Sequence, residues 1–334
     1  MIAVRDQMRA MQPGATQRAS ILITSYNTRA WLDRCLTAVL QEELDDTEIV
    51  VLENGSSDGS DELVRNRYPA VQLLVVTPNI GYVRAVNRLL VASHGRIVVL
   101  LDSDAEPEPD ALRRLLDAME ADPSIGATAP RLVGDHGKLQ RWTAGHLPGF
   151  RSVSAYYLGI DRLAGRFGWD IGWFLARDIA TPADVAWLCS CCLAIRREAL
   201  TAVGLMNERY FSYMGDLDLC ERIGRAGWRM RYNPTVTVRH AQGRNTIREP
   251  GHAAPEAING LNEYLELHVN PLTYRALAVM QAAGYAGRAL LYACFGTARH
   301  DHFALRQARM HWKWFRIRCG FDAGLRRTPP GRIL

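Results

Sequence analysis

Long apolar runs are missing from this sequence, and their absence is the first constraint on what the protein can be. No stretch of about 18 uninterrupted apolar residues occurs. The nearest approach, residues 277–297, is broken by Gln281 and Arg288. Residues 1–19 are polar, carry three arginines and contain no apolar core of the kind a secretory signal needs. We therefore expect neither a membrane span nor a signal peptide, and we expect a cytoplasmic location.

A cysteine framework is also missing. The seven cysteines form no regular framework, and none stands at a zinc-finger spacing from a histidine. This pattern predicts reduced thiols rather than disulfides. Within Cys189-Ser190-Cys191-Cys192 we expect small packing residues rather than reactive groups.

Glycine-rich phosphate loops are absent from the start of the chain. No G-x-G-x-x-G follows the first apolar run, which disfavours a dinucleotide-dependent oxidoreductase. An early glycine-rich loop with a basic residue is missing too, which disfavours a nucleotidyltransferase. Repeats and low-complexity segments do not occur. What remains is a globular composition with 48% apolar residues, 22% charged residues and a net charge of +5.

Short apolar runs alternate with helical spacing through the first 130 residues. We expect strands at 20–24, 48–52, 71–76, 96–101 and 125–129, with helices between them. This alternation predicts an α/β fold in which helices flank a mostly parallel sheet. Residues 134–181 show no clear period and suggest a long loop region. Further on, we expect helices at 196–203 and 216–226 and two short strands at 228–232 and 235–238.

Polar clusters follow four of these strands. They are Ser25-Tyr26-Asn27, Glu53-Asn54-Gly55, Thr77-Pro78-Asn79 and Asp102-Ser103-Asp104. Ligands of parallel α/β sheets bind beyond the carboxyl ends of the strands. The sequence therefore predicts a binding site where these clusters meet.

The acidic step Asp102-Ser103-Asp104 has the spacing of a metal site. Two carboxylates at a strand end can hold Mg²⁺ or Mn²⁺ together with substrate phosphates. Such an ion stabilises a diphosphate leaving group. The alternative is a solvated turn that caps the next helix.

Two other segments suit a nucleotide. Glu53 and Asp58 in the turn after the second strand can face a base or ribose, or the segment is only a tight turn. Asn79 and Gly81 open a helix whose N-terminus suits an anion, and Arg84 can reach a phosphate. The alternative there is a helix cap with an exposed arginine.

A second acidic site begins near residue 216. Asp216 and Asp218 cannot share one helix face, so one should face the pocket and the other should cap or pair. A pocket carboxylate can take the proton of an attacking hydroxyl. His240, at a strand end, is either a metal or phosphate ligand or a satisfied core histidine.

Taken together, these motifs resemble family-2 glycosyltransferases, most of all their rhamnosyltransferase-like branch. The resemblance covers about residues 20–245 and includes Arg196-Arg197-Glu198-Ala199-Leu200 besides the motifs above. It implies a GT-A fold, a nucleoside-diphosphate-sugar donor (dTDP or UDP) and inversion at the anomeric carbon. The acceptor would be a hydroxyl of a glycan, glycolipid or small molecule, as in polysaccharide biosynthesis.

The resemblance also assigns roles residue by residue. Asp104, with Asp102, would hold the metal, His240 would lie beside it, and Asp216 would be the general base. The residues at the donor would be Ser25, Asn27, Glu53, Asp58, Asn79, Gly81, Arg84, Asp102 and Ser103. This chain has Glu53 where the family often has Asp, and Gly215 where a Glu commonly precedes the base. It has Asp102-Ser103-Asp104 where the branch often has Asn-Pro-Asp, which weakens the expectation of a rhamnosyl donor.

The C-terminal region differs from the rest in composition. We expect a flexible tail at 1–18, the GT-A domain at 19–245 and a helical region at 246–334. Basic residues alternate with tryptophans between 301 and 328, where Arg326 and Arg327 lie near the end. This mixture suits peripheral contact of residues 270–320 with the inner face of a membrane. Packing against the catalytic domain is the equal alternative, and binding of nucleic acid is a remote one.

Two rival functions stay open at this stage. The chain could be a catalytically inactive nucleotide- or glycan-binding protein with the same fold, or a nucleotidyltransferase. The presence of both carboxylates of the acidic step, of Asp216 and of His240 argues against the inactive alternative. A homo-oligomer is compatible with the sequence.

Overall fold

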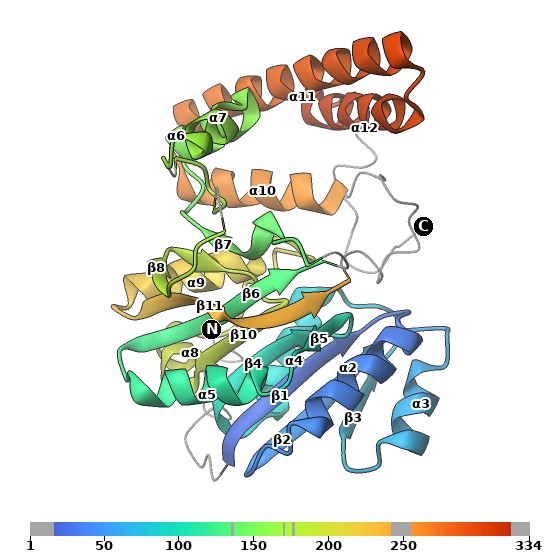
Figure 1. Ribbon diagram of the computed structural model, residues 1–334, viewed down its shortest axis with the longest axis vertical. Helices are drawn as coiled ribbons and strands as arrows, with labels where there is room; N and C mark the ends of the chain where they lie inside the picture. The colour runs from blue at the N-terminus through green and yellow to red at the C-terminus, as the bar shows by residue number, and fades with distance from the viewer. Residues whose placement is uncertain (1–16, 135–136, 170, 176–177, 242–254, 322–334) are drawn as a thin grey trace. The chain divides into compact units, whose positions relative to one another are not determined.

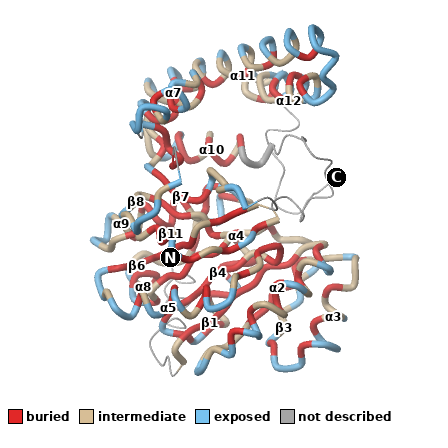
Figure 2. Tube along the Cα trace, viewed as in Figure 1, coloured by how far each residue is buried: buried red, intermediate tan, exposed pale blue. Residues whose placement is uncertain are grey.

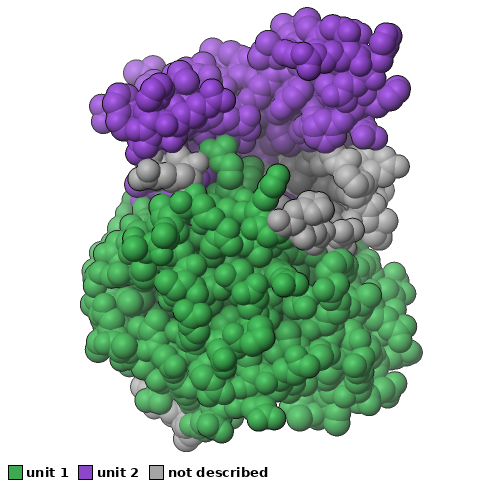
Figure 3. Space-filling model, viewed as in Figure 1, with its two compact units in different colours: residues 1–145, 178–211, 215–246 green, residues 146–177, 212–214, 247–334 purple. Residues whose placement is uncertain are grey.

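The computed structural model describes residues 17–134, 137–169, 171–175, 178–241 and 255–321. Most of the expected N-terminal tail (residues 1–16), and also Arg326 and Arg327, lie outside the described residues. The chain divides into two compact units, which Figure 3 colours separately. Unit 1 comprises residues 1–145, 178–211 and 215–246, and unit 2 comprises residues 146–177, 212–214 and 247–334.

Unit 1 is built on a mixed sheet of mostly parallel strands. In its described residues the strand order is β3-β2-β1-β4-β10-β6-β11-β5, with β8 paired to β11 (Figure 1). The strands are β1 (Gln17–Ser25), β2 (Thr47–Asn54), β3 (Gln72–Val76), β4 (Gly95–Asp102), β5 (Ala105–Pro107), β6 (Ile125–Val133), β8 (Ala183–Val185), β10 (Cys192–Arg196) and β11 (Arg229–His240). A small second sheet pairs β7 (Ala144–Gly145) with β9 (Trp187–Leu188). Strand β10 runs antiparallel between β4 and β6.

Helices pack on this sheet because their apolar residues recur at helical spacing. They are α2 (Arg29–Gln41), α3 (Ser60–Arg67), α4 (Tyr82–Ala92), α5 (Ala111–Ala121), α8 (Arg197–Val203) and α9 (Gly215–Arg225). In α5, Leu112, Leu115 and Met119 are fully buried. The central strands are buried along their length (Figure 2), as expected of strands covered on both faces. The predicted α/β fold is confirmed.

Two predictions about local structure are wrong. Residues 228–232 and 235–238 do not form separate strands, because β11 continues from Arg229 to His240. The ladder shifts register between Asn233 and Thr237, where Pro234 lacks an N–H to donate. The strand thus becomes irregular at the proline but does not end there.

The segment 134–181, predicted as loop, contains regular structure. It forms the 3-10 turn η1 (Arg141–Thr143), α6 (Phe150–Leu158) and α7 (Ile160–Arg166). The two helices meet at Gly159, whose φ of +75° only glycine adopts easily. Because each helix is short, no helical period persists long enough to be read from the sequence.

Unit 2 is helical in its described residues. With α6 and α7 it contains α10 (Pro255–His268), α11 (Pro271–Arg299) and α12 (His302–Cys319). Gly284 of α11 lies where a β-carbon would stand 2.8 Å from the carbonyl oxygen of Tyr157. The hydroxyls of Tyr157 and Tyr285 are 2.8 Å apart. Among the described helices, none combines the length and the apolar character that a membrane crossing requires.

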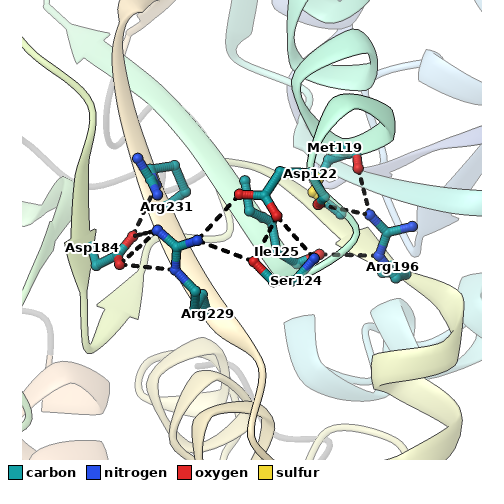
Figure 4. Close-up of polar contacts among 8 residues, drawn as sticks. All are labelled: Met119, Asp122, Ser124, Ile125, Asp184, Arg196, Arg229 and Arg231. Atoms are coloured by element: carbon teal, nitrogen blue, oxygen red, sulfur yellow. Dashed lines mark hydrogen bonds and ion pairs between the residues drawn. The ribbon is translucent and has the colours of Figure 1, made fainter.

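The amino ends of β6 and β11 carry a network of paired charges (Figure 4). Arg229 contacts Asp184 at 2.9 Å and Asp122 at 3.2 Å. Arg231 lies 2.8 Å from Asp184. Arg196 donates to the carbonyl oxygens of Met119, Asp122 and Ile125. These contacts join β6, β8, β10 and β11 at the sheet end opposite the predicted site.

Candidate active site

The sheet register brings the predicted strand-end clusters together. Ser25 at the end of β1 pairs with Glu53 at the end of β2. On the other side of β1, Thr24 pairs with Asp102 at the end of β4. Parallel strands end at one edge, so these polar groups become neighbours.

Small hydroxyl side chains fix the turn after β4. Thr28 lies 2.7 Å from the hydroxyl of Ser103 and 3.3 Å from that of Ser25. All three residues are buried. The side chains of Ser25 and Ser103, expected at the donor, therefore bind one another through Thr28 and hold the acidic turn in place.

The turn after β2 is tied to the turn after β1. Asn27 accepts a hydrogen bond from the backbone N–H of Ser57 at 2.9 Å, and its own N–H donates to Ser56 at 2.8 Å. Asp58 accepts from the N–H of Arg29 at 2.8 Å. Both side chains thus shape the edge of the site.

Glu53 lies under this turn with unused bonding capacity. It is buried, and one carboxylate oxygen accepts from the N–H of Ser56 at 3.1 Å. Its other oxygen lacks a hydrogen-bond partner among the described residues. Burial raises the pKa of Glu53 above its usual range.

Asn79 and Gly81 form a close turn before α4. Asn79 accepts from the N–H of Gly81 at 2.8 Å. At Gly81 the φ is +87°, and a β-carbon would stand 2.7 Å from the ring of Phe211, so only glycine fits. Arg84 is partly exposed and lies 3.4 Å from Glu208.

The acidic turn faces His240. Strand β5 pairs with β11 so that Ala105 stands opposite His240. The Nε2 atom of His240 is 3.4 Å from Asp104 Oδ1 and 3.9 Å from Asp102 Oδ2. Both oxygens of Asp104 are buried and lack a hydrogen-bond partner among the described residues.

Gln140 orients the histidine. Its amide nitrogen donates to the backbone oxygen of His240 at 2.7 Å. Its amide oxygen therefore faces His240 Nδ1, at 2.8 Å, and accepts its proton. This contact leaves the Nε2 lone pair directed at the carboxylates, as in the outer shell of histidine metal sites.

Cys191 completes this group. Its Sγ atom, a carboxylate oxygen of Asp102 and a ring nitrogen of His240 all lie within 4.8 Å of one another. A hydrogen bond with Cys189, whose sulfur is 3.0 Å away, and burial raise the pKa of the Cys191 thiol well above its usual range. Our expectation of simple packing for this cysteine did not anticipate its position.

Asp216 and Asp218 diverge at the start of α9. Asp216 accepts from the N–H of Ser190 at 3.0 Å and from that of Leu217 at 2.9 Å. Asp218 is buried and pairs with Arg222 at 2.9 Å. The hydroxyl of Tyr82 donates to the Ser190 carbonyl at 3.4 Å.

Burial dominates the electrostatics of the site. It raises the pKa of Asp216, and, with the charge of Asp104, it raises the pKa of Asp102 to about 6. Burial lowers the pKa of His240, but the negative charges of Asp104 and Asp102 outweigh it and raise the value overall. The carboxylates are crowded in a way that a bound cation would relieve.

Comparison with known proteins identifies the family of this chain. The model of glycosyl transferase family 2 matches residues 20–204. An N-acetylglucosaminyl-diphospho-decaprenol L-rhamnosyltransferase of Mycobacterium tuberculosis is 30% identical over 247 residues, 69% of this chain and 78% of the relative. A chondroitin synthase of Pasteurella multocida is 30% identical over 125 residues, 36% of this chain and 13% of that enzyme.

Among solved structures, a mannosyltransferase of Pyrobaculum calidifontis in complex with GDP-Man and Mn²⁺ has a TM-score of 0.49 and 21% identity, covering 96% of this chain and 93% of its own. The family match spans more than half of the chain, which therefore belongs to glycosyl transferase family 2 and is a glycosyltransferase with the GT-A fold. Within the family it is rhamnosyltransferase-like.

Proposed function

We propose that this glycosyltransferase is metal-dependent and inverting, and that it moves a hexosyl or deoxyhexosyl group from a nucleoside-diphosphate donor to a hydroxyl. The observation that carries the proposal is the Asp104 carboxylate, which is buried, has no hydrogen-bond partner for either oxygen among the described residues, and lies 3.4 Å from His240. A buried carboxylate without hydrogen bonds is costly, so a fold retains one where a ligand compensates it.

The donor set fits Mg²⁺ or Mn²⁺. Asp104 and Asp102 offer the oxygen ligands that these ions prefer, and His240 offers a ring nitrogen that Gln140 has already oriented. When bound, the ion would neutralise the diphosphate leaving group. The hydroxyls of Thr28 and Ser103 keep the turn from moving.

Asp216 is our candidate for the general base. The N–H of Ser190 and the N-terminus of α9 hold its carboxylate, and burial raises its pKa toward the range where a base works well near neutral pH. It would take the proton of the acceptor hydroxyl as that oxygen attacks the anomeric carbon. Asp218, being paired with Arg222, is not available for this role.

The nucleoside would lie along the turns after β1 and β2. Glu53 has one buried oxygen without a partner among the described residues, which suits a ribose hydroxyl or a base N–H. The hydrogen bonds of Asn27 and Asp58 hold these two turns together. Arg84, partly exposed at the start of α4, would approach the phosphates.

We propose a lipid-linked acceptor and contact with an anionic membrane surface. The M. tuberculosis relative is named for a decaprenol-linked acceptor. Helices α11 and α12 contain eight arginine or lysine residues and no acidic one. The exposed face of α11 carries an uncharged stripe, Leu272, Ala276, Val279, Ala283, Gly287, Leu290, Cys294 and Ala298. Apolar surface with surrounding positive charge suits an anionic bilayer.

Vesicle sedimentation tests the membrane proposal. The chain should sediment with phosphatidylglycerol vesicles and stay in solution with phosphatidylcholine vesicles. Val279→Glu with Leu290→Glu should abolish sedimentation. Val75→Glu, at an exposed position of β3 in unit 1, is the matched control. Equal sedimentation of all variants would contradict the proposal.

Calorimetry with dTDP-, UDP- and GDP-sugars tests the catalytic proposal. One nucleoside class should bind, and binding should require Mg²⁺ or Mn²⁺. The anomeric configuration of the product, followed by NMR with the donor that binds, should be opposite to that of the donor. Donor binding without a metal would contradict the proposed metal dependence. A product with the donor's anomeric configuration would contradict the proposed inversion.

A further inference from the structure

The position of Cys191 follows from strand pairing rather than from the flexible reach of a side chain. Cys192 opens β10 and pairs with Leu101 of β4. The next step of the ladder joins the carbonyl of Cys191 to the N–H of Asp102 at 3.0 Å. The backbone of Cys191 therefore lies directly beside the turn that carries the carboxylates.

Three ligand types meet at this point from three separate elements. The sulfur of Cys191, an oxygen of Asp102 and a ring nitrogen of His240 lie within 4.8 Å of one another. Ligand atoms that share one ion at about 2.0–2.3 Å stand within such a distance of each other. Independently, Asp104 is 2% exposed, has no hydrogen-bond partner for either oxygen among the described residues, and lies 3.4 Å from the same histidine.

We propose that Cys191 is a protein ligand of the active-site metal and makes the site prefer softer divalent ions, such as Mn²⁺, Co²⁺ or Cd²⁺, to Mg²⁺. The inference rests on the metal site of the proposed function and adds a ligand to it. Sulfur ligands favour soft ions, whereas carboxylates alone favour hard ones. On coordination the thiol proton leaves to solvent and the sulfur binds as thiolate.

The neighbouring thiol supplies a matched control. Cys189 lies 3.0 Å from Cys191, but its sulfur does not belong to the ligand group found among the described residues. Replacing either cysteine by serine makes the same chemical change two residues apart. Only the change at residue 191 should alter metal binding.

Cobalt spectroscopy on the full chain is the test, with a phosphine reductant to keep the thiols reduced. The native chain and Cys189→Ser should both show thiolate-to-cobalt charge-transfer absorption. Cys191→Ser and Cys191→Ala should lose it. By calorimetry, both variants at 191 should bind Cd²⁺ at least about tenfold more weakly, with Mg²⁺ affinity unchanged. Circular dichroism checks that each variant is folded.

The outcomes separate this inference from the proposal beneath it. Charge-transfer absorption or Cd²⁺ affinity that survives in both folded variants at 191 overturns the role of Cys191. If Asp104→Asn still abolishes ion binding in that case, the metal site itself stands. If the native chain binds no divalent ion, with or without nucleotide sugar, both the site and the inference fail.

Discussion

The two ends of the sheet in unit 1 differ in how their charged side chains are paired. At the amino ends of β6 and β11, Arg229 bridges Asp184 and Asp122. At the carboxyl ends of β4 and β11, Asp104 is buried, and neither of its oxygens has a hydrogen-bond partner among the described residues. Paired charges stabilise the fold, whereas crowded carboxylates without hydrogen bonds cost stability and prepare a binding site. We therefore expect variants at the carboxyl end to lose activity without losing stability, and variants at the amino end to lose stability without losing activity.

The largest loss of activity should come from Asp216→Asn. The amide cannot accept the acceptor proton, so turnover should fall about 10²–10⁴-fold while donor binding persists. Single-turnover transfer and donor calorimetry measure the two effects. Near-native turnover would remove Asp216 from its proposed role. Asp218→Asn, two residues further along α9 and paired with Arg222, is the control for general damage to α9.

Asp104→Asn should separate activity from stability. Losing an electrostatic contact to the transition state typically costs about 10²–10³ in rate. The metal-free variant should unfold at the same temperature as the native chain or above it, because a buried charge has been removed. Thermal unfolding in chelator, beside transfer assays, tests both halves. A large drop in unfolding temperature would mean that this carboxylate is structural.

Gln140→Leu should act more mildly. His240 keeps its place on β11 but loses the acceptor for its Nδ1 proton. Losing such an outer-shell partner typically weakens metal binding about 10–100-fold. Metal titration followed by calorimetry is the measurement, and Gln140→Glu, which keeps an acceptor, should restore most of the affinity. Unchanged binding in Gln140→Leu would contradict the orienting role.

The two ends should also respond oppositely to pH. Burial raises the pKa of Glu53, so the stability it contributes is present below its ordinary pKa of 4.5 and is lost as pH rises through the raised value. A hydrogen bond from Ser124 lowers the pKa of Asp122, whose contribution is present above 3.8 and lost as pH falls through the lowered value.

Unfolding temperatures across this pH range test that sign. Glu53→Gln should match or exceed the native chain at neutral pH, and its advantage should shrink in acid. Asp122→Asn should be less stable than the native chain at neutral pH, and its deficit should shrink in acid. Parallel curves for the two variants would contradict the assigned shifts.

The smallest effect should come from Arg229→Met. The ion pairs of Arg229 are partly exposed, and such pairs contribute about 0.2–1 kcal/mol each to the free energy of unfolding. Denaturant unfolding should detect this loss while transfer activity stays native. A loss of activity larger than the loss of stability would mean that the amino-end network also positions the site.

The fold and half of the site follow from local sequence patterns. Continuous apolar runs such as residues 20–24 predict parallel strands, and polar residues directly after them must meet at one edge. Asp102, Asp104 and Glu53 could be placed in this way. His240 could be placed too, because it ends an apolar run, although Pro234 makes its single strand look like two.

The rest of the site depends on long-range pairing. Cys191 reaches Asp102 because β10 inserts antiparallel beside β4, a pairing that no local period encodes. Gln140 contacts His240 across a separation of 100 residues, from a stretch without helical or strand spacing. Ser190 holds Asp216 for the same reason. A cysteine within two residues of a strand start was a visible signal, but it carried no indication of its partner.

Because β11 is continuous, the number of residues in it determines where the His240 side chain points. Arg229 begins the strand in the paired network, and His240 ends it at the acidic turn. The strand therefore sets the spacing between the network and the site. One residue inserted after Thr237 would rotate the imidazole to the opposite face of the sheet. The ladder is already irregular around Pro234. A residue inserted there can therefore be absorbed without moving His240.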